Sequence, residues 1–121
     1  MTKQLAIIGV ALALSLVGCG PIVAPVTLLT YEADRCHPAP AAGQLVADQQ
    51  YGTALLGSAW GHLVPVAWPS GYIGRYAGRE IEVVAPDGRV VAVTGKRYEL
   101  IGVGVDVGGT QAFGACNAFQ Q

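Results

Sequence analysis

A predicted β-hairpin at residues 80–94 constrains the fold of this chain more than any other stretch. Two runs rich in β-branched residues flank Pro86-Asp87-Gly88, where proline presets φ, aspartate bonds the local backbone and glycine accepts a positive φ. With Ala85 opposite Arg89, alternation directs one apolar set toward a core: Ile81, Val83, Val91 and Val93. The same register directs a second set away from it: Glu80, Glu82 and Thr94. The hairpin therefore predicts a sheet with one buried face.

Short strand signals on both sides of this hairpin indicate an all-β domain. Apolar runs at residues 53–56, 60–68, 71–76 and 97–107 are separated by glycine, proline and serine, and no long helical pattern interrupts them. We therefore predict a small five- or six-stranded antiparallel barrel of the OB-like type, because closure hides strand edges that would otherwise aggregate. A small β-sandwich is the alternative.

The first 18 residues have the pattern of a secretory signal peptide. A short polar start carrying Lys3 precedes an apolar run at residues 5–17, and small residues follow it. This run of 13 residues is shorter than the roughly 20 that a permanent membrane-spanning helix needs. We therefore expect the segment to be removed during export.

The end of this segment, Leu16-Val17-Gly18-Cys19, resembles the lipobox of bacterial lipoproteins at all four positions. The resemblance implies cleavage before Cys19 and lipidation of its sulfur and new amino group. Two or more acyl chains anchor a protein stably. We therefore expect an exported protein anchored to the bacterial cell membrane or outer membrane. An ordinary cleaved signal and an uncleaved anchor are the alternatives, but Leu16 and Gly18 fit conventional cleavage poorly.

The remaining length and charge limit the domain count and the partner class. Removal of 18 of the 121 residues leaves 103, enough for one small domain. We assign residues 1–18 to the signal peptide, 19–43 to a lipidated tether and linker, and 44–121 to a small β-barrel domain. Without Lys3, six basic residues face eight acidic ones, a formal charge of −2. No basic patch is present, which argues against a nucleic-acid partner.

The other two cysteines, Cys36 and Cys116, form an even number in an exported chain, where disulfides persist. We predict that they pair. The bridge would close a loop of about 80 residues and contribute roughly 4 kcal/mol in the chain-entropy treatment. Two separate buried thiols are the alternative. Because Cys36 and His37 are adjacent, they do not match the spaced ligands of structural zinc sites, and we predict no metal site or cofactor.

A second resemblance concerns turns and strands. The run Val66-Ala-Trp-Pro-Ser-Gly71, the hairpin residues 81–92 and Gly95 together look like a pattern in small, uncharacterised exported bacterial proteins. In that pattern a Trp-Pro-x-Gly turn precedes two valine-rich strands joined by Pro-Asp-Gly-Arg. The resemblance covers about a quarter of the chain. It implies an OB-like barrel and brings no catalytic residues.

The candidate binding residues are aromatic residues and one histidine: Trp60, His62, Trp68 and Tyr72. Alternation places Trp60 and His62 on one strand face, whereas Pro65 is expected to interrupt the ladder before Trp68. A ligand or partner groove is one interpretation of this set. Packing in the core is the other, because aromatic residues dominate small cores.

No catalytic set emerges from the remaining polar residues. Ser58 and Ser70 lie in turn sequences without a nucleophile-elbow motif, and the Glu80–Glu82 pair is expected to face water. We therefore predict a non-enzymatic envelope lipoprotein that displays a small β-barrel and binds a protein or another envelope component. The alternative is a lipoprotein that binds a small ligand or metal through its aromatic and histidine surface. A hydrolase is the least supported reading.

Overall fold

The computed structural model describes residues 25–121, so the predicted signal peptide and Cys19 lie outside the described residues. Within that range every regular element is a strand: β1 (Pro25–Val26), β2 (Leu29–Tyr31), β3 (Ala39–Asp48), β4 (Gly52–Ser58), β5 (Gly61–Pro69), β6 (Ile73–Ala77), β7 (Glu80–Val84), β8 (Val90–Val93), β9 (Arg97–Val107) and β10 (Thr110–Gln120). No helix long and apolar enough to cross a membrane occurs among these residues.

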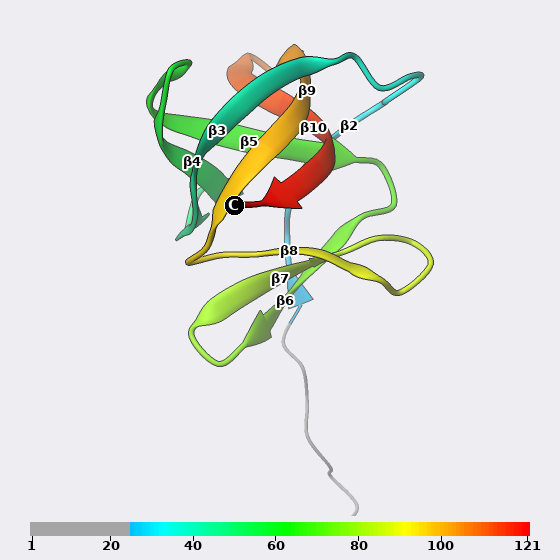
Figure 1. Cartoon of the computed structure of the whole chain (residues 1–121). Helices are drawn as coiled ribbons and strands as arrows, with labels where there is room; N and C mark the ends of the chain where they lie inside the picture. The colour runs from blue at the N-terminus through cyan, green and yellow to red at the C-terminus, as the bar shows by residue number, and fades with distance from the viewer. Residues whose placement is uncertain (1–24) are drawn as a thin grey trace, which may run out of the picture.

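Five of the strands close into a barrel, which confirms the predicted all-β, OB-like fold (Figure 1). Around the barrel the order is β3, β4, β5, β10 and β9, and β9 pairs with β3 again. A closed ring with an odd number of strands cannot alternate direction at every pair. The exception here is the pair β5–β10, which is parallel and joins Val66 to Phe113 and Ala67 to Gly114. The barrel is therefore antiparallel except at its closure.

The predicted hairpin lies outside the barrel, in a second sheet of order β1-β6-β7-β8. In Figure 1 this sheet lies below the barrel. Val83 of β7 and Ala92 of β8 are buried in the same hydrophobic cluster as the barrel residues. The second sheet therefore covers one end of the barrel and shares its core. The hairpin covers one end of the barrel, and neither of its strands belongs to the barrel wall.

The turn of the hairpin is as predicted, but the register of its strands differs. Ala85 N–H donates to the Arg89 carbonyl at 2.9 Å, and Gly88 has a positive φ of 90°. Beyond the turn a β-bulge leaves Val91 unpaired, because Val84 pairs with Val90 and Val83 with Ala92. The extra residue exchanges the two faces of β8.

This exchange corrects the predicted buried set. Ala92 and Thr94 are buried, whereas Val91 and Val93 are only partly buried. The Thr94 hydroxyl accepts a hydrogen bond from Ile81 N–H at 2.8 Å and donates one to a Glu80 carboxylate oxygen at 2.7 Å. Thr94 is therefore a buried, fully bonded residue and does not point toward solvent.

The folded unit begins earlier than the predicted boundary at residue 44. β3 runs from Ala39 to Asp48 without a break and pairs with both β4 and β9. β1 and β2 also lie within the range assigned to the tether, and β2 pairs in parallel with β5. Pro40 is accommodated opposite Ile101. A stretch rich in proline and alanine has a weak intrinsic preference for the β-strand conformation. Pairing with a strand on each side of β3 outweighs this weakness.

The core fills the barrel and extends to the second sheet. Its buried residues come from seven of the ten strands and from Leu28 between β1 and β2: Leu28, Ala41, Leu45, Leu55, Val66, Trp68, Val83, Ala92, Tyr98, Leu100, Phe113 and Ala115. One contiguous cluster of this kind defines a single domain.

Candidate functional site

The four predicted binding residues do not form one surface, because β5 separates them. Trp60 immediately precedes β5, and Trp68 lies next to its last residue. Eight residues of extended strand correspond to about 26 Å. His62 is exposed near the first end, and Tyr72 follows the second end in sequence. The molecule therefore has two candidate regions, the Trp60 end and the Trp68 end of β5.

At the Trp60 end, the indole is held on one side and open on the other. Its Nε1–H donates to the Pro40 carbonyl at 3.1 Å, and its ring meets Phe113 edge-on with a centroid distance of 4.9 Å. The ring also packs against the backbone of Gly104, where an added Cβ would lie 3.2 Å from an indole carbon. Even so, Trp60 is 46% exposed. It is a fixed aromatic side chain with a free surface.

A groove adjoins Trp60 between β5 and the β9–β10 hairpin. It consists of two neighbouring pockets of about 250 and 490 Å³ that share Leu63, Pro65 and Gln111. Leu63 is 48% exposed. β5 and β10 pair only at Val66 and Ala67, so among the described residues the edge of β5 before Val66 has no ladder partner on the β10 side. The groove thus combines exposed apolar side chains with unpaired strand backbone.

The far wall of the groove is shaped by the β9–β10 turn. Asp106 accepts a hydrogen bond from Gly109 N–H at 2.9 Å and another from the Gln111 side-chain amide at 2.7 Å. These bonds fix the turn and hold Gln111 against the groove. Asp106 and Gln111 were not among the predicted site residues, and only their position beside a glycine turn distinguishes them in the sequence.

His62 lines neither pocket, although it lies on β5 close to both. The ladder between β4 and β5 also continues through Pro65, which pairs with Ala54, so the predicted interruption is absent. Residues 25–121 hold no cluster of three His, Cys, Asp or Glu side chains that could bind a metal ion.

At the Trp68 end, the tryptophan belongs to the core, as the alternative interpretation held. Trp68 is 1% exposed, and its Nε1–H donates to Thr53 Oγ1 at 2.9 Å. Tyr72 stacks on it, with ring centroids 6.4 Å apart and planes inclined by 13°. Only the half-buried Tyr72 ring of this pair is open to a ligand.

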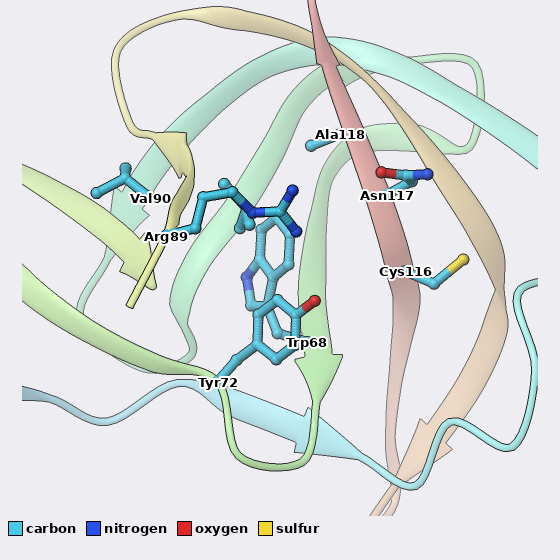
Figure 2. Close-up of a pocket in the computed structure, with 8 residues that line it drawn as sticks. Trp68, Tyr72, Arg89, Val90, Cys116, Asn117 and Ala118 are labelled. Carbon is cyan, nitrogen blue, oxygen red and sulfur yellow. The ribbon is translucent and has the colours of Figure 1, made fainter. Parts of the chain in front are cut away.

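A pocket of about 240 Å³ lies beside this stacked pair, between β8 and β10 (Figure 2). Sequence reasoning missed two polar residues in its lining, Arg89 and Asn117. The two lie 28 positions apart in a turn and a late strand, and no local pattern connects them. Figure 2 shows the Arg89 guanidinium and the Tyr72 hydroxyl directed into the space between the two strands, with Asn117 across from them on β10.

The predicted disulfide is confirmed at the edge of this pocket. Cys36 and Cys116 are 80 positions apart and are bonded, with Cα atoms at 5.6 Å. Cys116 is the unpaired residue of a β-bulge, because the β9–β10 register shifts between Ala115 and Asn117. A bulge redirects side chains. Here it directs the Cys116 sulfur toward the segment that carries Cys36.

Tyr31 lies close to the same region. Its hydroxyl donates to the Ala115 carbonyl at 3.2 Å. Burial raises the pKa of Tyr31 above its usual value of 10.0, and the nearby Tyr72 raises it further. The neutral phenol is therefore the form that suits this site.

Comparisons of the chain with protein families, with curated proteins and with solved structures found no match. The fold and the two candidate regions therefore rest on the chain's own residues.

Proposed function

We propose that this protein is a non-enzymatic envelope lipoprotein whose barrel binds an extended segment of another envelope protein at the Trp60 end. The sequence at Cys19 supports the anchor, since all four lipobox positions fit. The disulfide suits an exported protein, because such bonds persist in oxidising compartments.

The observation that carries the binding proposal is the groove between β5 and the β9–β10 hairpin. Exposed Trp60 and Leu63 supply apolar contacts, and the unpaired edge of β5 supplies backbone donors and acceptors. An extended polypeptide satisfies both, because it adds main-chain hydrogen bonds to an open strand edge and places alternate side chains in pockets. We therefore assign a polypeptide rather than a glycan to this groove.

The OB-like fold supports the same location. Barrels of this type bind ligands over their second and third strands and the adjoining loops. The corresponding parts here are β4, β5 and the turns at either side of the groove. This support is an analogy of fold, and the residues in the groove carry the specific argument.

The proposed anchor would leave the groove accessible. Pro25 is six positions after Cys19, a distance of at most ~21 Å for an extended chain. β1, which begins at Pro25, belongs to the second sheet, and the β4–β5 turn that carries Trp60 lies at the opposite end of the barrel (Figure 1). The second sheet would therefore face the membrane while the Trp60 end projects from it.

Photocrosslinking in intact cells tests the binding proposal. A photoreactive amino acid replaces Leu63 in the full-length chain, and the same residue replaces Phe119 as a control, because Phe119 is 54% exposed but lies outside both pockets of the groove. We expect an adduct from position 63 that Trp60→Ala abolishes and that protease digestion of the partner removes. Equal adducts from both positions, or an adduct removed by glycan-degrading enzymes instead, contradict the proposal.

The anchor has a separate test. Cells supplied with a labelled fatty acid should label the wild-type protein but not Cys19→Ala, and only the wild type should sediment with membranes. A wild-type protein without label refutes lipidation even if crosslinking succeeds.

A further inference from the structure

We propose that the pocket at the Trp68 end is a second binding site, independent of the groove, which takes a small monocarboxylate such as the C-terminus of a peptide. The pocket lies between β8 and β10, at the end of the barrel that the second sheet covers. The proposed binding of a polypeptide at the Trp60 end does not use this pocket.

Three polar side chains from three separate segments line this pocket. Arg89 comes from the β7–β8 turn, Tyr72 from the segment before β6, and Asn117 from β10. Among residues 25–121, no hydrogen bond engages the Arg89 guanidinium, the Tyr72 hydroxyl or the Asn117 amide. Unused polar groups that converge on one cavity are the usual mark of a ligand site.

The charge of the lining points to a monoanion. Within the described part of the chain, Arg89 is the single charged residue in the lining, and no carboxylate lines the pocket. Asp87 forms a long ion pair with Arg89, with 3.9 Å between a carboxylate oxygen and Nε. The Arg89 and Asp87 side chains are 72% and 66% exposed, so this pair contributes little, and its length leaves the guanidinium without a hydrogen bond to Asp87. A guanidinium fork matches the two oxygens of a carboxylate. One arginine balances one negative charge, which favours a carboxylate over a doubly charged phosphate.

The size and the remaining lining define the rest of the ligand. About 240 Å³ is smaller than a typical drug-sized site of roughly 300–1,000 Å³. Val91, Ala118 and the Tyr72 ring, which stacks on the buried Trp68, provide apolar walls. These walls suit a short aliphatic group next to the carboxylate, as in a peptide that ends in alanine.

Part of the pocket wall is fixed before any ligand binds. Trp68 is fixed by its bond to Thr53, and Cys116 in the pocket wall is fixed by the disulfide. Asn117 follows the β-bulge at Cys116, whose backbone is held by this crosslink. A rigid site binds with less loss of conformational entropy than a flexible one.

NMR titration of the intact purified protein tests this proposal. The probes are N-acetyl-Ala-Ala as the free acid, the same peptide as its C-terminal amide, and propionate. We expect the free acid to bind with a Kd on the order of 1 mM, and to shift the Asn117 side-chain amide and the Trp68 indole N–H. The Trp60 indole N–H, at the other end of β5, is an internal control and should not move.

The two sources of the carboxylate are distinguished by the other probes. Tighter binding of the peptide acid than of propionate indicates a peptide terminus, whereas equal affinities indicate a short free acid; both results support a monocarboxylate site. Binding of the amide as strong as that of the acid overturns the proposal.

A matched pair of arginine variants gives the decisive comparison. Arg89→Gln should weaken binding about tenfold or more, because it removes a charge-assisted hydrogen bond. Arg79→Gln, an exposed arginine in the β6–β7 turn outside the pocket, should leave the affinity unchanged. Asn117→Ala should weaken binding by a smaller factor. Equal affinity of Arg89→Gln and wild type, with an unchanged fold in the NMR spectrum, overturns the site.

Discussion

The two tryptophans of β5 have the same chemistry and opposite environments. Trp60 is 46% exposed and Trp68 is 1% exposed. Both indole N–H groups have an acceptor, the Pro40 carbonyl for Trp60 and Thr53 Oγ1 for Trp68. Hydrogen bonding therefore does not distinguish them. The two tryptophans differ in how far the rest of the protein covers each ring.

The covering follows from the topology of the two ends of β5. The second sheet packs over the Trp68 end and adds Val83 and Ala92 to the core around it. At the Trp60 end, β5 and β10 diverge before Val66, and the ring contacts Phe113 and Gly104 with no layer outside it. One end of the strand therefore contributes to stability and the other presents a surface. Substitutions at the two ends of β5 test this division.

The largest expected effect is that of Trp68→Ala. The variant should lose about 5 kcal/mol of unfolding free energy, because truncating a buried tryptophan costs roughly 3–5 kcal/mol and Thr53 loses its buried partner. Urea denaturation followed by circular dichroism measures the change.

Trp60→Ala is the matched comparison, with an expected loss of about 1 kcal/mol for a half-exposed ring. Equal losses from the two variants would show that the two ends contribute alike, and the division would be wrong.

Removing the disulfide should have the next largest effect. The double variant Cys36→Ser with Cys116→Ser should lose roughly 4 kcal/mol, because the unfolded chain regains the entropy of an open loop spanning 80 positions. Denaturation of wild type and variant without reductant measures this loss. Thiol titration of the unreduced, unfolded wild type should find neither cysteine free; two free thiols would contradict the bond.

A single hydrogen bond at the Trp68 end gives a smaller effect. Thr53→Val keeps the shape of the side chain but leaves the buried Trp68 N–H without an acceptor, which should cost about 2 kcal/mol. Thr30→Val lies on the partly buried β2 strand, and the Thr30 side chain makes no hydrogen bond within residues 25–121, so this variant should change stability by less than about 0.5 kcal/mol. The same denaturation experiment compares the two, and a Thr53 variant as stable as the Thr30 variant would show that the bond contributes little.

Local chemistry made much of the fold predictable. The turn at Pro86-Asp87-Gly88 forms as predicted because its requirements are local. Proline restricts φ, the Asp87 carboxylate accepts a hydrogen bond from Arg89 N–H, and Gly88 adopts a positive φ. The disulfide was predicted because two cysteines remain besides Cys19 and because disulfides persist in exported proteins. The position of the hairpin outside the barrel and the bulge at Val91 were not predictable, because both depend on how β7 and β8 pack over the distant barrel. The start of β3 was not predicted for a similar reason. Its proline-rich sequence does not favour a strand, and pairing with β4 and β9 stabilises the strand there.

The candidate sites were less predictable than the fold. Alternation along β5 predicts which residues share a face, but not where along the strand a second layer begins to cover it. From the sequence, a groove and core packing therefore remained open for Trp60 and Trp68 alike. Arg89 and Asn117 carried no signal at all, because their proximity arises only when β8 and β10 lie on either side of one pocket.

The smallest expected effect concerns the pH dependence of the Trp68 end, where Tyr31 lies. Burial and then Tyr72 raise the pKa of Tyr31 in the folded protein above 10.0. The folded state thus retains this proton at a pH where the unfolded chain loses it, so the stabilisation is complete below about pH 10 and is lost as the pH rises through the folded-state pKa. Tyr31→Phe should flatten the alkaline part of a stability–pH curve, at a cost of about 1 kcal/mol at neutral pH for the lost bond to Ala115. If the variant and the wild type had the same slope of stability against alkaline pH, the pKa of Tyr31 would not be raised by its surroundings at the Trp68 end.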